Sequence, residues 1–292
     1  MSNDELDLAR RVDAAQSILA TAAADEARRL EQALAVCNRR FAASMARLDP
    51  ASRASAVDAA GGTVIFAGAG SPVTQGLAMG LRGPVTAADL DLVEAQLCPD
   101  GSGARQLELC PFADATLPAE LARRGYRVHE WQLVWTRRVP ETALAPPPPE
   151  LRIARVRPGE EELFLRVIMS GFLETEEVPE EVVAMMRPVA FAEQHELYLA
   201  WLGDEAIGGA TLAWTDGVAF ISGSGVRPAF RRRGSQGALI RARLDRAREL
   251  GCDLACSNTL PGTSSRRNME RHGFSVAYPK LVMLRDGATR TS

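Results

Sequence analysis

The chain has 292 residues, of which 46% are hydrophobic and 24% charged, a composition that argues against an intrinsically disordered or fibrous protein. Its net charge of -3 and pI near 5.8 argue against nucleic acid as the main partner, because binding to a phosphate polymer depends on clustered cationic side chains. No segment approaches the roughly 20 continuous apolar residues that span a bilayer, and the acidic start lacks the pattern of a signal peptide, so we expect a cytoplasmic protein without a membrane partner.

Residues 2–48 carry the signals of α-helix. Apolar residues recur at helical spacing in two stripes, Leu8, Val12, Ala15 and Leu19, then Leu30, Leu34, Cys37 and Phe41. An alanine-rich segment between the stripes breaks the heptad that a free coiled coil requires. We therefore expect two amphipathic helices, or one long helix, that cover another part of the protein.

From Gly61 the sequence changes to short apolar runs separated by glycine, TVIFAGAG and GLAMGLRG, followed by TAADLDLVEAQL with Thr86 as a candidate N-cap. This order predicts strand, strand and helix. Residues 139–150 contain four consecutive prolines and can form neither a helix nor a central strand. We predict a linker there, which divides the chain into domains at 1–138 and 151–292.

The second half predicts strands and helices in a mixed order, typical of an α/β (α+β) domain with a mixed sheet. Strand LRIARV and helix EELFLRVIMSGF are followed by an acidic, irregular stretch. Three strands come next, ELYLAWL, IGGATLAW and AFISGSGV, then a helix over 234–250 and strand CDLACSN. A short helix over 264–271 and a strand pair, FSVAY and KLVMLR, end the pattern.

An internal repeat relates the two halves. The segment 121–137 aligns with 269–285 at a constant offset of 148 residues, and six of the seventeen positions are identical. The same offset places the strand RQLELC on DLACSN and the helix from Thr86 on the helix from Gly234 without a gap. We interpret the halves as two copies of one fold.

The run RRRGSQGA, at residues 231–238, joins a strand to a helix whose apolar stripe is Ile240, Leu244, Ala247 and Leu250. A helix N-terminus offers free N–H groups and partial positive charge, which favour a pyrophosphate. Gly234 and Gly237 permit close backbone approach, and three arginines add charge. The alternative is a solvated arginine run at the start of a packing helix.

These residues resemble the signature of the GNAT superfamily of N-acetyltransferases: Arg or Gln, two residues, Gly, one residue, then Gly or Ala. Arg231 and Gly234 fill the first two places, and Gln236 departs from the last. The VRP of 226–228 and the HGF of 272–274 resemble further family features. The resemblance covers residues 151–285 and implies tandem GNAT-like domains, the first one degenerate and preceded by helices.

The resemblance implies an enzyme that transfers an acetyl or other short acyl group from acetyl-CoA to an amine of a small molecule or peptide. It implies a V-shaped opening between the fourth and fifth strands of the domain, with the Val226 N–H as the donor to the developing oxyanion. The expected contacts to coenzyme A are Gly225, Val226, Arg227, Arg231, Arg232, Arg233, Gly234, Ser235, Gln236, Gly237, Ala238, Ser264 and Asn268.

The groups that would move protons depart from the family. Met269 occupies the place of the usual tyrosine acid, so Tyr278 is the nearest alternative acid. Three carboxylates in the acidic stretch are candidate bases or simply a solvated loop: Glu174, Glu176 and Glu177. The five cysteines form no CxxC pair, and we expect no metal.

In the first copy, the positions that match the phosphate loop are residues 83–88, where the arginines are missing and Pro84 removes one N–H donor. We therefore expect one coenzyme A site per chain. The missing acid and base keep a rival function open, a non-catalytic acyl-CoA-binding or scaffold protein. The sequence identifies neither the acceptor nor the oligomeric state.

Overall fold

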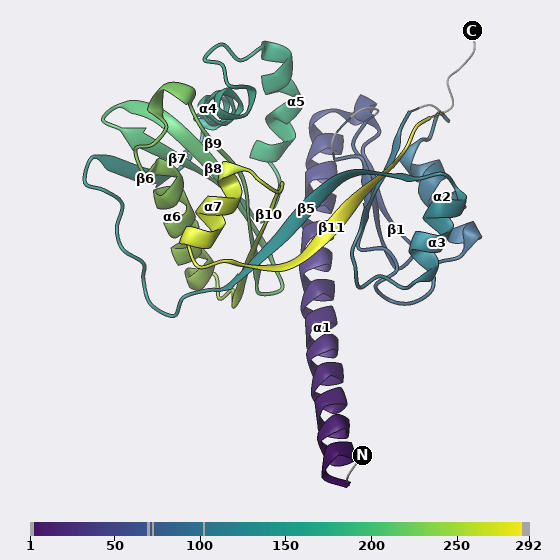
Figure 1. Cartoon of the computed structure of the whole chain (residues 1–292). Coiled ribbons are helices and arrows are strands. Elements are labelled where there is room, and N and C mark those ends of the chain that lie inside the picture. The colour runs from purple at the N-terminus through teal and green to yellow at the C-terminus, as the bar shows by residue number, and fades with distance from the viewer. Residues whose placement is uncertain (1–2, 69–70, 72, 102, 288–292) are drawn as a thin grey trace.

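The computed structural model describes residues 3–68, 71, 73–101 and 103–287, with the side chains described from residue 20 onward. Within this part, one eleven-stranded mixed sheet runs through the molecule in the order β1-β2-β3-β4-β11-β5-β10-β9-β8-β7-β6 (Figure 1). The strands are β1 (Ser55–Ala59), β2 (Gly62–Phe66), β3 (Gln75–Leu77), β4 (Arg105–Leu109), β5 (Arg127–Arg138), β6 (Leu151–Arg155), β7 (His195–Leu202), β8 (Glu205–Thr215), β9 (Val218–Val226), β10 (Leu254–Thr259) and β11 (Ser275–Arg285). The expected mixed-sheet fold class is confirmed.

Seven α-helices of the described residues cover the two faces of this sheet. They are α1 (Asn3–Leu48), α2 (Ala87–Leu97), α3 (Thr116–Arg123), α4 (Glu161–Leu173), α5 (Glu180–Ala190), α6 (Ser235–Glu249) and α7 (Ser264–Arg271). Alternate residues of a strand point to opposite faces. In β7, Leu197 and Leu199 belong to the core under α4 and α5, whereas Tyr198 and Ala200 belong to the core under α6. Helices α4 and α5 thus lie opposite α6.

Helix α1 is one helix of 46 residues rather than two. Its residues from Ala27 to Ala42 pack against Ile65 and Leu77 of the first half and against Val218 and Leu254 of the second. The helix thus joins both halves on one face of the sheet. The earlier apolar stripe, from Leu8 to Leu19, lies outside the residues whose side chains are described.

The two halves exchange their last strands. Strand β5 of the first half lies between β10 and β11, and β11 of the second half lies between β5 and β4 (Figure 1). Lys280 stands opposite Gln132 in the β5–β11 ladder, and these two positions are 148 residues apart. Antiparallel strands that meet at matched positions are related by a local twofold axis, so the repeat is also a structural pseudosymmetry.

The 148-residue offset is confirmed by several elements: α3 maps onto α7 along its whole length, and the first residues of α2 and α6 coincide. Two expectations are corrected. The strand pair predicted around Pro279 is one strand, β11, because β5 gives it a pairing partner on both sides of the proline. The stretch predicted to be irregular contains α5.

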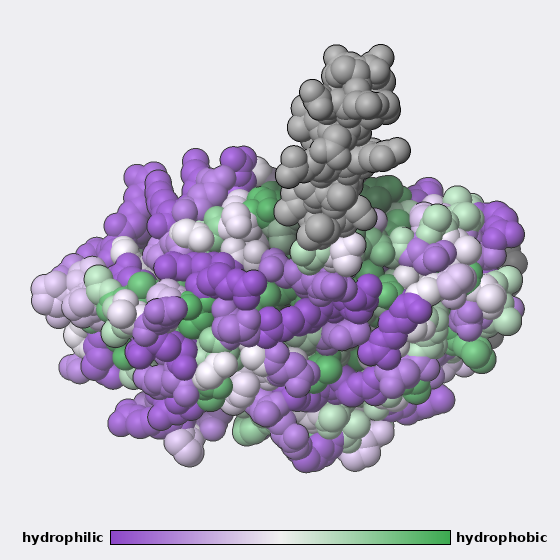
Figure 2. Space-filling model, turned by 90° about the horizontal axis from the view of Figure 1, so that it is seen from below, coloured by the Kyte–Doolittle hydropathy of each residue, from purple (hydrophilic) through white to green (hydrophobic). Residues whose placement is uncertain are grey.

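Residues 139–150 contain no helix or strand, since β5 ends at Arg138 and β6 begins at Leu151. The division into domains at 1–138 and 151–292 stays a prediction, because β5 and β11 cross between the halves. No helix of the described residues has the length and apolar character needed to cross a membrane. Figure 2 shows polar side chains over most of the face seen from below, with apolar residues in separate patches.

Candidate functional site

The sheet opens between β9 and β10. These parallel strands pair only from Val218 opposite Leu254 to Phe220 opposite Cys256. Beyond that point β9 continues to Val226 and β10 to Thr259 with no further pairing between them. The edge of β9 that faces β10 is therefore free of strand partners over its last residues, at the place where the resemblance implies a V-shaped opening.

A β-bulge redirects β9 within this opening. Gly209 stands opposite Gly225 and Thr211 opposite Ser222, so Gly223 and Ser224 together face one residue of β8. Gly223 has φ +50°, and a Cβ there would lie 3.0 Å from Thr211 Oγ1. Both the left-handed backbone and the lack of space favour glycine. The bulge is therefore built into the sequence SGSG.

The Val226 N–H points toward the opening. The Arg227 N–H donates to the Ile207 carbonyl at 2.9 Å, while Val226 stands opposite Gly208. This pattern makes Val226 and Gly208 a non-hydrogen-bonded pair, in which the N–H and C=O groups point away from the partner strand. The Val226 amide thus faces the free edge of β9.

Helix α4 forms a close wall beside this amide. A Cβ added to Gly171 would lie 2.6 Å from the Val226 nitrogen, and one added to Gly225 would collide with the Ile168 carbonyl oxygen. Neither glycine could carry a side chain without moving the helix from the strand. Backbone packs directly against backbone here, which fixes the end of β9.

The predicted phosphate loop forms the start of α6. Gly234, with φ +80°, is the N-cap, and the first backbone bond of the helix runs from the Ala238 N–H to the Gly234 carbonyl, 3.0 Å. The N–H groups of Ser235, Gln236 and Gly237 come before that bond and have no partner within the helix. The side chains of Ser235 and Ala238 are buried, so these two positions can contribute only backbone groups to a ligand.

The arginines around this helix start differ in their contacts. Arg231 Nη1 lies 3.1 Å from Glu174 Oε1, and Arg227 Nε lies 2.7 Å from Glu176 Oε2. Two of the three candidate bases are therefore paired with arginines of the predicted coenzyme A site. Arg232 and Arg233 are exposed and make no ion pair with the described residues, so their charges are available to an anion.

Helix α7 adjoins the first turn of α6. A Cβ on Gly237 would lie 3.0 Å from His272 Nε2, and the His272 N–H donates to the Asn268 carbonyl at the end of α7, 3.2 Å. Asn268 is half-buried and Ser264 is exposed at the first position of the helix. The structure thus places the helix that carries both residues next to the predicted loop.

Tyr278 does not lie at the opening, and its assignment as the acid is corrected. It is buried on β11, which β5 and β10 separate from β9. Its hydroxyl donates to Glu31 Oε1 of α1 at 2.8 Å, beside an ion pair between Lys280 and Glu108. Burial and the Glu31 carboxylate raise the pKa of Tyr278 far above its usual value. The sequence of β11 gave no indication that this strand would pair with β5 and β4 of the first half.

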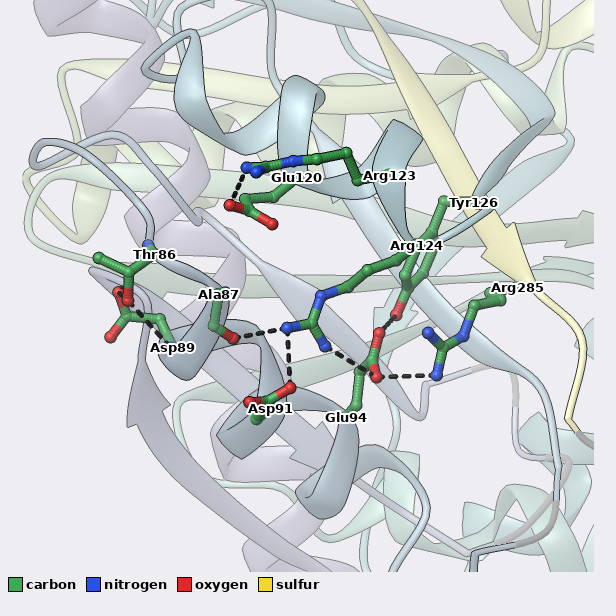
Figure 3. A network of polar contacts seen from close by, with 10 residues as sticks. All are labelled: Thr86, Ala87, Asp89, Asp91, Glu94, Glu120, Arg123, Arg124, Tyr126 and Arg285. Carbon is green, nitrogen blue, oxygen red and sulfur yellow. Dashed lines mark hydrogen bonds and ion pairs between the residues drawn. The ribbon is translucent and has the colours of Figure 1, made fainter.

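The matching helix start in the first half is closed by its own carboxylate (Figure 3). Asp89 Oδ2 accepts from the Thr86 N–H at 2.8 Å and from the Thr86 hydroxyl at 2.7 Å, and the Asp89 N–H donates back to Thr86 Oγ1. This reciprocal capping box satisfies two backbone donors. These bonds lower the Asp89 pKa, so the cap is charged at neutral pH.

A second network closes the rest of this region. Arg124 contacts the Ala87 carbonyl at 2.6 Å and pairs with Asp91 at 2.7 Å, while Glu94 accepts from Tyr126 at 3.1 Å and from Arg285 at 2.8 Å (Figure 3). The charged groups around α2 are therefore satisfied by one another.

Sequence reasoning missed two residues of the candidate site, Gly171 and Gly223, and one buried arginine packed against β8 and β9, Arg243, whose Nη1 donates to the Thr211 and Ser222 carbonyls. Gly223 had a signal, because the alternating glycines of SGSG in a strand indicate a bulge or a close approach. Arg243 also had one, since it lies three residues after Ile240 and one before Leu244 on the apolar face of its helix. Gly171 had none, because its partner is distant in the sequence.

Residues 164–274 match the model of the Acetyltransferase (GNAT) family. A search of curated proteins found no match. Among solved structures, a GCN5-related N-acetyltransferase from Kribbella flavida is 16% identical with a TM-score of 0.61, over 86% of this chain and 96% of that one. A tandem GNAT protein from the clavulanic acid biosynthesis pathway is 13% identical with a TM-score of 0.57, over 79% of each chain.

A GCN5-related N-acetyltransferase from Sphaerobacter thermophilus is 17% identical with a TM-score of 0.51, over 68% of this chain, which spans 65% of that protein. At such identities these structures show a shared fold alone, and the tandem GNAT protein gives the tandem arrangement some support. The family match concerns residues 164–274, and the solved structures add a shared fold over a larger part of the chain.

Proposed function

We propose that the protein is an N-acetyltransferase that transfers an acetyl or other short acyl group from coenzyme A to an amine of a small molecule or peptide. The observation that carries the proposal is one arrangement: a free strand edge that ends at Val226 is joined through η2 (Pro228–Phe230) to the helix start at Ser235–Gly237. Arg232 and Arg233, which make no ion pair with the described residues, lie just before that helix start. A pyrophosphate fits the helix start, and an amide-bearing pantetheine arm fits the strand edge.

In this proposal the acyl donor binds by its pyrophosphate at the start of α6, with Arg231, Arg232 and Arg233 neutralising its charge. The pantetheine arm pairs with the backbone of Gly225–Arg227. The Val226 N–H, which faces the opening, then donates to the thioester carbonyl and stabilises the oxyanion that forms. The amine attacks this carbonyl carbon directly, the carbon–sulfur bond breaks, and the thiolate leaves.

Proton transfer in the proposed reaction uses no tyrosine. Met269 is buried, and Tyr278 lies away from the opening. A thiol has a pKa of about 8.5, so a departing thiolate can take its proton from water without a strong acid. An alkylammonium has a pKa of about 10.4 and must lose a proton before attack. The carboxylates on the α4–α5 connection, Glu174, Glu176 and Glu177, are the candidate bases.

The absence of a tyrosine at the opening also favours the second candidate function, a non-catalytic acyl-CoA-binding or scaffold protein. Isothermal titration with acetyl-CoA, followed by a thiol-release assay with a broad panel of primary amines, separates the two. Binding with amine-dependent thiol release supports the enzyme. Binding without release by any amine supports the binding protein, and the lack of binding would contradict both.

A further inference from the structure

Arg243 is a buried cation in the interior of the second half. It lies on α6 and is 1% exposed. Its Nε donates to the Leu239 carbonyl at 3.0 Å, and its Nη1 donates to the carbonyls of Thr211 at 2.9 Å and Ser222 at 3.1 Å. No carboxylate of the described residues forms an ion pair with it, so backbone carbonyls alone are seen to satisfy this guanidinium.

Packing alone does not account for an arginine at this place. The neighbouring helix positions, Ile240, Leu244 and Ala247, are buried and apolar, and an apolar side chain would avoid the cost of desolvating a charge. Burial lowers the pKa of Arg243 to about 9, which still leaves it cationic at neutral pH. The side chain therefore brings a buried positive charge with several fixed donors into the core.

The two strand carbonyls that Arg243 binds lie at the base of the β9 bulge. Thr211 and Ser222 form the last regular pair before Gly223 and Ser224 interrupt the ladder. A bulge leaves backbone groups without their ladder partners. One guanidinium nitrogen bridges both strands at this point, and Thr211 Oγ1 donates to the same Ser222 carbonyl at 3.0 Å.

We propose that Arg243 is a positioning residue, which fixes the β9 bulge and thereby the direction of the free edge at Gly225–Arg227. The inference rests on the proposed function, because it assigns this edge to the acyl-pantetheine arm. The guanidinium acts on the strand and not on the phosphate loop, which begins beyond η2 (Pro228–Phe230). Loss of Arg243 should therefore weaken recognition of the arm and spare recognition of the nucleotide diphosphate.

The test compares two ligands in the full-length protein by isothermal titration: acetyl-CoA, and 3′-phosphoadenosine 5′-diphosphate, which lacks the pantetheine arm. In Arg243→Met we expect acetyl-CoA affinity to fall at least about tenfold, the equivalent of one lost hydrogen bond of about 1.4 kcal/mol, while diphosphate affinity stays within about threefold. Arg243→Lys retains the charge but not the planar fork, and should recover part of the loss. Arg248→Met, at the other end of α6, is the matched control and should change neither affinity.

A second variant keeps the test decisive if circular dichroism shows that Arg243→Met does not fold. Thr211→Val removes the other donor to the Ser222 carbonyl at nearly constant volume, and should shift the ratio of the two affinities in the same direction by a smaller factor. If the wild-type protein prefers acetyl-CoA and folded Arg243 and Thr211 variants keep that preference, the inference is overturned while the proposed function stands. If the wild-type protein binds no acetyl-CoA, the proposed function itself fails.

Discussion

The starts of α6 and α2 occupy matching places in the two halves, yet only the α6 start leaves its backbone N–H groups available to an external anion. The N-cap of α6 is Gly234, with φ +80°, whereas the matching N-cap of α2 is Thr86. At α6 the first N–H groups have no partner within the helix, and three arginines precede them in the chain; at α2 the Asp89 carboxylate already accepts from the Thr86 N–H. A helix N-terminus is therefore only half of an anion site. The neighbouring side chains determine whether the helix start binds an external anion, such as a pyrophosphate, or a carboxylate of the protein, such as Asp89.

The largest effect on acetyl-CoA affinity should come from adding a side chain at Gly234, where the ligand is expected to approach the backbone closely. In Gly234→Val a β-branched side chain in the left-handed region adds strain of about 1–2 kcal/mol, so the loop should relax out of its shape. We expect acetyl-CoA affinity, measured by isothermal titration, to fall at least about 100-fold, which corresponds to about 2.8 kcal/mol. Gly83→Val, at a positive-φ glycine three residues before the α2 N-cap, is the control in the first half. It should cost stability but leave affinity unchanged, and equal affinities in the two variants would refute the site.

A smaller effect should follow from removing the free charges at the same helix. The double variant Arg232→Ala/Arg233→Ala should bind acetyl-CoA about tenfold more weakly at low salt, since each exposed charge contributes on the order of 0.5–1 kcal/mol. The difference from wild type should shrink as salt rises, because the interaction is screened. A loss that does not depend on salt would point to a packing role instead. Arg123 and Arg127, exposed in the first half, provide control alanine variants.

Opening the α2 cap should affect stability but not create a second site. Thr86→Ala removes the capping hydroxyl, which should lower the free energy of unfolding by about 1 kcal/mol in a urea titration. The freed helix start still lacks the three arginines that precede α6 and follows Pro84, so the number of acetyl-CoA molecules bound per chain should not change. A second binding event in this variant would show that Asp89 and Thr86 alone had kept the first half closed.

The smallest effect concerns the carboxylate that faces the α6 loop. Glu174 pairs with Arg231 across an exposed contact, and such pairs are worth about 0–1 kcal/mol. Glu174→Gln should free Arg231 for the pyrophosphate and raise acetyl-CoA affinity by up to about threefold. Glu177→Gln, on the same connection, is the control. Weaker binding in Glu174→Gln would mean that the ion pair shapes the loop for its ligand.

Helices and strands could be predicted from the local sequence wherever the hydrophobic pattern lies within the element itself. Helix α7 was predicted at the residues where it lies, and α6 within a residue of its start. The exchange of β5 and β11 could not be predicted, because two copies of one fold offer each strand equivalent partners in either half. Tyr278 was misplaced for the same reason: its chain neighbours place it near the opening, while the exchange carries β11 to the other side of β5.

The phosphate loop of the candidate site could be predicted from the sequence, but the long-range contacts that hold β9 in place could not. Glycines and arginines at 231–238 indicate a phosphate site directly, because the chemistry is local. The contact of Gly171 with Val226 and the bridge from Arg243 to Thr211 join residues 32 to 55 positions apart. Such contacts depend on how α4 and α6 pack on the sheet, which no local pattern determines.

The binding stoichiometry of acetyl-CoA in the wild-type protein tests the central comparison most directly. Isothermal titration at low salt, with the protein concentration fixed by quantitative amino-acid analysis, counts the sites in both halves at once. We predict one acetyl-CoA per chain, bound at the start of α6. A stoichiometry near two would contradict the closure of α2 by Asp89, and a single site that survives in folded Gly234→Val but is lost in Gly83→Val would place the binding in the wrong half.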